Sequence, residues 1–300
     1  MTPVGSIQRA LDQIEAGLQG PLPVEGLARK AAMSPWHFQR TFALLVGEPV
    51  ATHIRLRRLT EAARRLRGSE ETILEVALDY QFESHEAFTR AFRARFFYTP
   101  SAWRRGRGAL SQPQEPIRLD EAATRKRFSR MKLTPDFISL PEATYVGLQA
   151  PFIMIVSPDA NNLTVIPKLW RAFMERRHEI AKDPDGPQVI YGLCQAPEQV
   201  GVTRIHPDEA MYLAAVEWPA GGKAPKGMVT WSVPKATYAR FTHHGPVETV
   251  GQTYGAIYGS WLGSDGRQRG PGPDIERYDQ RFKMGSPDSA FEILVPIVKG

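Results

Sequence analysis

The sequence has little cysteine and no long apolar run, and both absences narrow the class of protein. Its one cysteine, Cys194, cannot form an intrachain disulfide, and no Cys/His cluster has the short paired spacing of a zinc site. No uninterrupted apolar stretch reaches about 18 residues, and the first ten residues carry no apolar run of signal-peptide length. These absences exclude a disulfide scaffold and a zinc finger. They predict a cytoplasmic protein with no membrane partner, metal or cofactor.

Length and charge predict two domains with different partners. A chain of 300 residues suits two domains because single cores stop growing at roughly 250 residues. The net charge of +6 is uneven: residues 1–108 hold 16 Lys and Arg against 11 Asp and Glu, whereas residues 133–300 hold 16 against 18. This excess of positive charge predicts a polyanionic partner for the N-terminal part.

The apolar pattern changes character along the chain. Residues 5–108 show helical periodicity between short polar breaks, which predicts an all-α domain. Residues 109–130 lack this periodicity and are rich in turn-forming and charged residues, as a linker would be. Residues 131–300 mix β-branched and aromatic runs with helical segments at 166–180 and 247–261, which predicts an α+β domain. The expected fold is therefore multidomain, all-α followed by α+β.

A short internal repeat refines the prediction for the α+β domain. Residues 140–145 (LPEATY) recur as residues 233–238 (VPKATY), and each copy precedes a strand-like run, a helix and further strands. This repeat predicts two related β-α-β-β units with a groove at their junction.

The all-α domain contains two candidate helix-turn-helix units. In the first, a short helix over 24–32 and a turn lead to a helix that Ser34 caps and Gly47 stops. In the second, a helix over 73–80 and a turn over 81–83 lead to a helix from Ser84 to Phe96. A long helix over 50–67 lies between them. Such a spacer holds two reading helices about one turn of DNA apart.

The second helix of each unit has an apolar stripe and a polar remainder. Phe38 and Phe42 mark the stripe in one helix, and Phe88, Phe92 and Phe96 mark it in the other. Off these stripes lie residue types that read DNA bases or contact phosphates. These candidate DNA contacts are Trp36, His37, Gln39, Arg40, His85, Glu86, Thr89 and Arg90.

These motifs resemble the DNA-binding domain of the AraC/XylS family of regulators. The matching stretches are residues 34–42 (SPWHFQRTF), 54–66 (IRLRRLTEAARRL), 82–93 (FESHEAFTRAFR) and 99–104 (TPSAWR). The resemblance implies a transcription regulator that binds double-stranded DNA, and we expect an activator that contacts RNA polymerase. The family's dimerising arm has no counterpart here, so we expect a monomer on DNA.

The sequence departs from the family at two turns where glycine is common. Gln81 occupies the turn of the second unit, and Phe97-Tyr98 precedes the Thr-Pro pair at 99–100. A left-handed turn at Gln81 costs about 1 kcal/mol relative to glycine, which bears on how the second reading helix is placed.

The C-terminal half resembles the GyrI-like (gyrase-inhibitor-like) effector-binding domain. The matching stretches are residues 140–143 (LPEA), 166–170 (IPKLW), 233–246 (VPKATYARFTHHGP), 254–261 (YGAIYGSW) and 274–278 (DIERY). The resemblance implies a small-molecule effector, and in multidrug-responsive regulators of this kind aromatic walls and a carboxylate hold lipophilic cations.

We therefore predict a ligand site in which Glu276 is the carboxylate, because ring faces attract a cation and a buried carboxylate neutralises it. The candidate wall residues are Tyr145, Trp170, Tyr238, Tyr254, Tyr258, Trp261 and Tyr278. The spacing of the three aromatic residues at 254, 258 and 261 also fits an ordinary helix core, and Glu276 also fits a solvated turn.

Two other functions for the α+β domain stay open at the level of sequence. Glu276 with a nearby tyrosine has the chemistry of a general base, as in a small-molecule hydrolase. The chain shows no nucleophile-elbow motif, metal-ligand set or phosphate loop, so we expect no enzyme. Alternatively, the aromatic residues line an interface that docks a protein.

Overall fold

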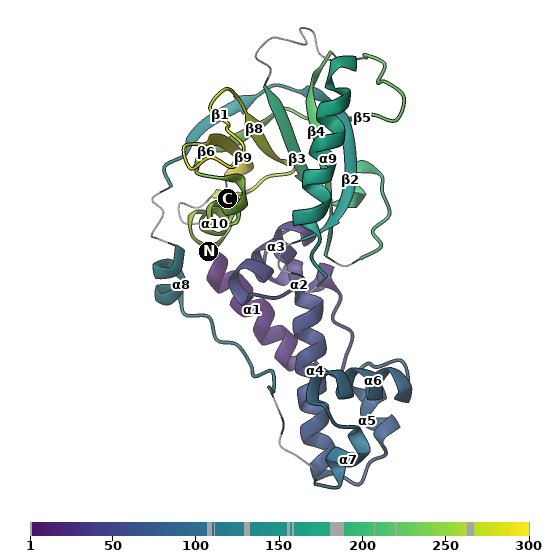
Figure 1. Ribbon diagram of the computed structural model, residues 1–300. Coiled ribbons are helices and arrows are strands. Elements are labelled where there is room, and N and C mark those ends of the chain that lie inside the picture. The colour runs from purple at the N-terminus through teal and green to yellow at the C-terminus, as the bar shows by residue number, and fades with distance from the viewer. Residues whose placement is uncertain are drawn as a thin grey trace. The chain divides into compact units, whose positions relative to one another are not determined.

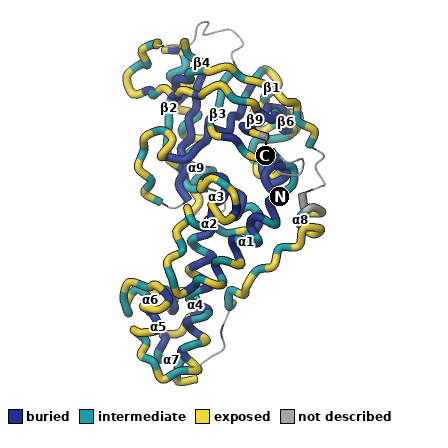
Figure 2. The backbone as a smooth tube through the Cα atoms, turned by 180° about the vertical axis from the view of Figure 1, so that it is seen from behind, coloured by how far each residue is buried: buried dark blue, intermediate teal, exposed yellow. Residues whose placement is uncertain are grey.

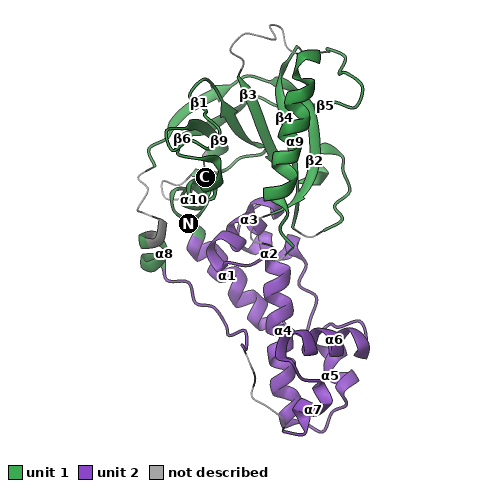
Figure 3. Ribbon diagram, viewed as in Figure 1, with its two compact units in different colours: residues 1–3, 121–300 green, residues 4–120 purple. Residues whose placement is uncertain are grey.

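The computed structural model describes every residue except 1, 107–109, 111, 129–132, 155–156, 158, 181–188, 207, 220, 263–266 and 300 (Figure 1). The chain divides into two compact units, residues 4–120 and residues 1–3 with 121–300 (Figure 3). The predicted ends of the linker, residues 109 and 130, and the predicted start of the second domain, residue 131, lie outside the described residues.

The first unit is helical, as the periodicity predicts. Its helices are α1 (Pro3–Ala16), α2 (Val24–Lys30), α3 (Pro35–Val46), α4 (Val50–Gly68), α5 (Ile73–Asp79), α6 (His85–Phe96) and α7 (Pro100–Arg104). Helices α2 and α3 form the first predicted helix-turn-helix unit, and α5 and α6 form the second. Helix α4 is the predicted spacer between them.

Local capping chemistry sets the ends of the two reading helices. The Ser34 hydroxyl accepts a hydrogen bond from the backbone N–H of His37, and Pro35 occupies the first turn of α3. The Ser84 hydroxyl caps α6 in the same way. Helix α3 ends at Gly47, whose φ of 90° is the left-handed conformation that glycine adopts without steric cost.

The predicted aromatic stripes form the interior of this unit. The rings of Phe88, Phe92 and Phe96 are fully buried and stack in sequence, with centroid distances of 5.5 and 4.8 Å. In α3, Phe38 and Phe42 are also fully buried, with centroids 5.7 Å apart. Both predictions of the buried helix face are confirmed.

Part of the predicted linker is bound to the helical unit. The backbone N–H of Gln114 donates to the Thr60 hydroxyl at 2.9 Å, and its carbonyl accepts a hydrogen bond from Arg57. Arg57 is almost fully buried and also forms two hydrogen bonds with Glu15, at 2.7 and 2.6 Å, and one with Glu61. Helix α4 therefore contributes a buried ion pair as well as solvated arginines.

The second unit contains one antiparallel β-sheet, whose strands differ in length, together with several helices. The strands are β1 (Asp136–Leu140), β2 (Ala143–Ile153), β3 (Ile190–Gln195), β4 (Glu209–Trp218), β5 (Val229–Val233), β6 (Ala236–His244), β7 (Arg267–Arg269), β8 (Asp274–Tyr278) and β9 (Ala290–Lys299). The helical segments are α8 (Glu121–Phe128), α9 (Asn162–Arg176), η1 (Arg177–Glu179), η2 (Pro197–Val200), η3 (Val247–Thr249), α10 (Val250–Ala256) and the π-helical turn η4 (Ile257–Trp261). The predicted α+β character is confirmed. Among the described residues, no helix is long and apolar enough to cross a membrane.

The sheet order places β3 and β8 side by side at its centre. The strands follow one another as β1-β6-β9-β8-β3-β4-β2-β5, and β7 pairs with β9. The two copies of the short repeat occupy equivalent registers, because Leu140 lies opposite Ala236 and Val233 lies opposite Ala143. Each copy links the ends of two successive strands.

Strand alternation separates an apolar face from a polar one. Leu193, Met211, Leu213 and Ile275 point to one face and belong to a single buried cluster. The residues between them, which include Tyr212 and Glu276, point to the other face. Helix α9 packs against β2 and β4 (Figure 1), and the central strands are buried along most of their length (Figure 2).

Candidate functional sites

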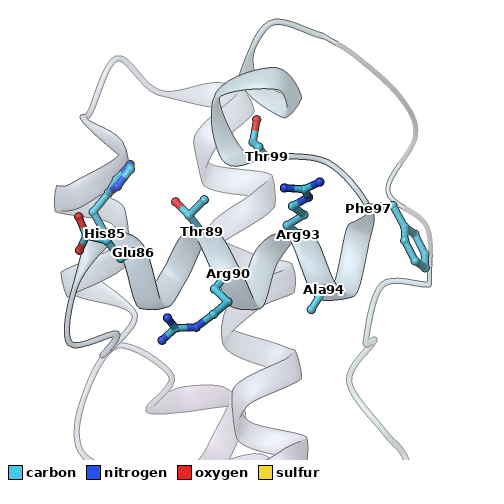
Figure 4. A pocket seen from close by; sticks show the side chains of 8 residues that line it. All are labelled: His85, Glu86, Thr89, Arg90, Arg93, Ala94, Phe97 and Thr99. Atoms are coloured by element: carbon cyan, nitrogen blue, oxygen red, sulfur yellow. The ribbon is translucent and has the colours of Figure 1, made fainter.

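The outer face of α6 forms a shallow cleft of about 750 Å³ (Figure 4). Its lining includes all four residues predicted for this helix and reaches the start of α7: His85, Glu86, Thr89, Arg90, Arg93, Ala94, Phe97 and Thr99. Glu86 and Arg90 are exposed, and His85 and Thr89 are half-buried. The second helix-turn-helix unit therefore presents a polar, accessible surface.

The charges in this cleft are available to a nucleic acid. Neither Arg90 nor Arg93 forms an ion pair with any described residue. A backbone hydrogen bond at the start of α6 and one from Ser84 lower the pKa of Glu86, so its carboxylate is ionised at neutral pH. An ionised carboxylate repels phosphate but accepts a hydrogen bond from the amino group of cytosine.

The candidate residues on α3 are less accessible. Trp36, His37 and Gln39 are each less than a tenth exposed, and Arg40 is half-buried. Among the candidate residues, those on α6 are therefore more exposed than those on α3.

Two left-handed residues adjoin α6 at opposite ends. Gln81 has a φ of 63°, the conformation expected from its place in the turn, and its side-chain amide donates to the carbonyl oxygen of Gln19 at 2.8 Å. That hydrogen bond offsets part of the cost of about 1 kcal/mol that a non-glycine residue incurs here. Phe97 has a φ of 65° at the C-terminal end of α6, where α3 has Gly47.

In the second unit, Glu276 lies within a cluster of aromatic residues. Its Oε2 accepts hydrogen bonds from the hydroxyls of Tyr212 at 2.6 Å and Tyr278 at 2.9 Å, and its Oε1 accepts one from Tyr254 at 3.0 Å. The indole N–H of Trp170 donates to the Tyr212 hydroxyl at 3.2 Å. We call these five residues the Glu276 cluster.

Burial keeps the phenols of Tyr212 and Tyr278 protonated. Glu276 is 8% exposed, and burial raises the pKa of both Tyr212 and Tyr278 well above the ordinary value. The charge of Glu276 raises both pKa values further. The hydroxyls therefore remain donors at physiological pH, and they hold the carboxylate at a fixed place beside the ring of Trp170, which lies 5.4 Å from that of Tyr278.

The absence of a side chain at Gly192 makes room for this arrangement. Gly192 pairs with Glu276 in the register of β3 and β8, and a Cβ at this position would lie 2.0 Å from the Tyr212 hydroxyl and 2.9 Å from Oε2 of Glu276. The phenol therefore passes over β3 to the carboxylate only because residue 192 is glycine.

We expect Gly192→Ala to lower the free energy of unfolding by about 1–3 kcal/mol, because the added methyl group displaces the buried phenol of Tyr212. Urea unfolding followed by tryptophan fluorescence measures this change. Gly251→Ala is the matched control, since a Cβ there meets no atom within 4 Å. Equal stability of the two variants would contradict a tight fit at Gly192.

The structure brings only some of the predicted wall residues to Glu276. Trp170, Tyr254 and Tyr278 lie in the cluster. Tyr145 and Tyr238 belong to the apolar cluster on the other face of the sheet. The remaining two lie elsewhere: Tyr258 donates to Asp274 at 2.6 Å, and Trp261 packs on Phe241 with centroids 4.8 Å apart.

Sequence reasoning missed Tyr212. It lies in the run 211–216, which the sequence predicts as a strand, and its neighbours Met211 and Leu213 belong to the apolar cluster. The alternation of that strand separates Tyr212 from its apolar neighbours, but the register of β4, β3 and β8 is what brings it to the face of Glu276.

A second buried polar network lies next along β8. The Arg269 guanidinium pairs with Asp274 at 3.0 Å and donates to the hydroxyl of Tyr258 at 3.2 Å. The side chains of Arg269 and Asp274 are 2% and 0% exposed. This network fixes the π-helical turn η4 to β8.

The fold and these sites define a DNA-binding protein with two helix-turn-helix units and a separate α+β unit that carries a buried carboxylate. Comparison with known families gives a match for each of the two parts of the chain. Residues 133–298 match the model of the GyrI-like small molecule binding domain, and residues 27–106 match a helix-turn-helix domain. The chain belongs to the GyrI-like family, and with its AraC-type helix-turn-helix domain it is a DNA-binding transcription regulator.

Two relatives match this chain over almost its whole length, and a third matches over less than half of it. The chain is 27% identical to transcriptional regulator Rob of Salmonella typhimurium strain LT2 over 305 residues, which covers 99% of each protein. It is 29% identical to the right origin-binding protein of Escherichia coli K12 over 310 residues, again 99% of each. It is 38% identical to transcriptional regulator BrlR of Pseudomonas aeruginosa over 134 residues, 44% of this chain and 46% of the relative.

Proposed function

We propose that this protein is a one-component regulator that reads double-stranded DNA with α3 and α6 and binds a lipophilic cation at the Glu276 cluster. The proposal of cation binding rests on one observation, a buried carboxylate that three tyrosine hydroxyls hold beside a tryptophan ring. Ring faces attract a cation, and a carboxylate of low exposure neutralises it with little screening by water.

The geometry of the helical unit supports a two-box DNA site. Helix α4 has 19 residues and is therefore about 28 Å long at 1.5 Å per residue. This length suits two reading helices in successive major grooves, about 34 Å apart along the duplex. A single chain then contacts an asymmetric site, so we propose a monomer on DNA.

The hydrogen bonds that Glu276 accepts from three tyrosines favour a role in ligand binding over a role in catalysis. Three hydroxyl groups donate to the carboxylate. The oxygens of this carboxylate are already occupied by these donors, whereas a hydrolase needs a carboxylate oxygen that faces a water molecule. The three relatives described above are named as regulators or as an origin-binding protein, and we propose a regulator that acts in the cytoplasm, where the DNA is.

We also infer that the α+β domain consists of two related β-α-β-β units. The sheet order supports this inference, because β1-β6-β9-β8 and β5-β2-β4-β3 are equivalent when the two units are exchanged. The junction of the halves then lies between β3 and β8, where Gly192 faces Glu276. The cluster therefore occupies the place where a pseudo-symmetric domain forms its binding groove.

Selection from a pool of random duplexes tests the regulator as a whole. The full-length protein is expected to enrich an asymmetric motif with two boxes about one turn apart, with an affinity that falls steeply as salt rises. Addition of tetraphenylphosphonium is expected to change the fraction of DNA bound. Recovery of no motif would contradict sequence-specific reading. Transcription of the selected site with purified RNA polymerase then tests the further proposal that the protein is an activator.

The substitution Arg90→Ala is expected to weaken binding to the selected duplex about tenfold, because an arginine that contacts a base or phosphate contributes about 1–3 kcal/mol. Fluorescence anisotropy at two salt concentrations measures the loss. Arg171→Ala on α9 is the control, since Arg171 is also exposed but lies in the other unit. Equal affinity of the two variants would remove Arg90 from the reading surface.

A further inference from the structure

Phe97 occupies an unusual position for a phenylalanine. It ends α6 in the left-handed conformation, with a φ of 65°, and its side chain is 74% exposed. It makes no ring contact within the described part of the chain. About three quarters of its large apolar side chain is therefore open to solvent.

Two other left-handed residues of the helical unit, Gly47 and Gln81, differ from Phe97. Gly47 ends α3 at the equivalent place and incurs no steric cost, because it has no Cβ. Gln81 is also left-handed, but its side chain donates a hydrogen bond to Gln19. Phe97 has neither property, and unlike Ala32, which is also left-handed with a φ of 55°, it adds a large apolar ring that is mostly exposed to solvent.

The surroundings of Phe97 match the chemistry of one partner. Phe97 and Ala94 give the C-terminal half of the α6 cleft an apolar surface, and Arg93 and Thr99, which line the same cleft, add a cation and a hydroxyl (Figure 4). A deoxyribose ring beside a phosphate has the same combination, an apolar sugar face next to an anion. A protein partner is disfavoured because the rest of this cleft is the proposed reading surface of the helix.

We propose that Phe97 packs against a deoxyribose ring of the bound duplex while Arg93 contacts the adjacent phosphate, which positions the C-terminal end of α6 on the DNA backbone. This inference rests on the proposed function, because it requires that α6 binds DNA. It assigns Phe97 to the backbone and not to a base, so its contribution does not depend on sequence.

The test compares Phe97→Gly with wild type in the full-length protein, on the selected duplex and on a random-sequence duplex at low salt. Glycine relieves the left-handed strain, so the melting temperature of the helical unit is expected to rise by about 4 °C. Loss of the ring is expected to weaken binding to both duplexes about fivefold. A gain in stability together with a loss of affinity separates a DNA contact from a structural role. Phe97→Tyr, which retains the ring, is expected to bind within about twofold of wild type.

Three results would overturn parts of this assignment. Equal affinity of wild type and Phe97→Gly for both duplexes contradicts the role of Phe97 alone. A loss confined to the selected duplex also contradicts it, since the ring would then read a base. Failure of the wild type to bind either duplex contradicts the proposed function as well.

Discussion

Replacing Glu276 with glutamine is expected to weaken the binding of tetraphenylphosphonium about thirtyfold. The substitution preserves the size of the side chain but removes the charge that neutralises the cation. At a few ångströms in a partly buried site that charge contributes about 2 kcal/mol. The glutamine amide also adds donors opposite the protonated hydroxyls of Tyr212 and Tyr278. Isothermal titration of the full-length protein measures the loss.

Glu142→Gln provides the matched control, because Glu142 is exposed in the loop between β1 and β2. It removes the same charge far from the cluster and is expected to leave the affinity within about twofold of wild type. If Glu276→Gln bound the cation as tightly as this control, Glu276 would not be the counter-charge. Binding by the wild type but not by Trp170→Ala would still place the ligand at the cluster.

The substitution Arg269→Met is expected to lower the free energy of unfolding of the second unit by about 3–5 kcal/mol. It leaves the carboxylate of Asp274 fully buried without its ion-pair partner and removes one hydrogen bond to the hydroxyl of Tyr258. An unpaired buried charge costs far more than the net contribution of the pair itself. Thermal and urea unfolding measure the loss of stability.

Two comparisons isolate this effect. Asp136→Asn breaks a pair with Arg240 whose carboxylate is 73% exposed, and it is expected to cost less than about 1 kcal/mol because water screens exposed pairs. The double variant Arg269→Met with Asp274→Leu removes both buried charges and is expected to recover much of the lost stability. If Arg269→Met were as stable as Asp136→Asn, Asp274 would not depend on Arg269 for its burial.

Sequence alone was sufficient for the features that depend on near neighbours. Both reading helices were predicted with their caps, because Ser34 and Ser84 bond to backbone groups three residues away. Their buried faces were predicted from the spacing of phenylalanines at one helical period. The left-handed turn at Gln81 follows from its place in the motif. Each of these is a contact within one or two turns of chain, so the order of residues determines it.

The residues around Glu276 also include some that the sequence indicated and one that only the tertiary structure brings there. The carboxylate and three of its aromatic neighbours were among the residues that the motifs indicated. Tyr212 was not, because its hydroxyl reaches Glu276 across 64 residues of sequence and over the strand that carries Gly192. Sheet order and register bring these residues together, and no local pattern encodes either.

The tertiary structure also decided the different surroundings of residues that look alike in the sequence. Arg57 and Arg55 lie two residues apart on α4, yet Arg57 is buried in a pair with Glu15 while Arg55 is exposed. Tyr254 and Tyr258 lie four residues apart, yet they bond to Glu276 and Asp274, respectively. Composition and spacing are alike in each pair. Their roles differ because burial depends on what packs against a side chain from distant parts of the chain.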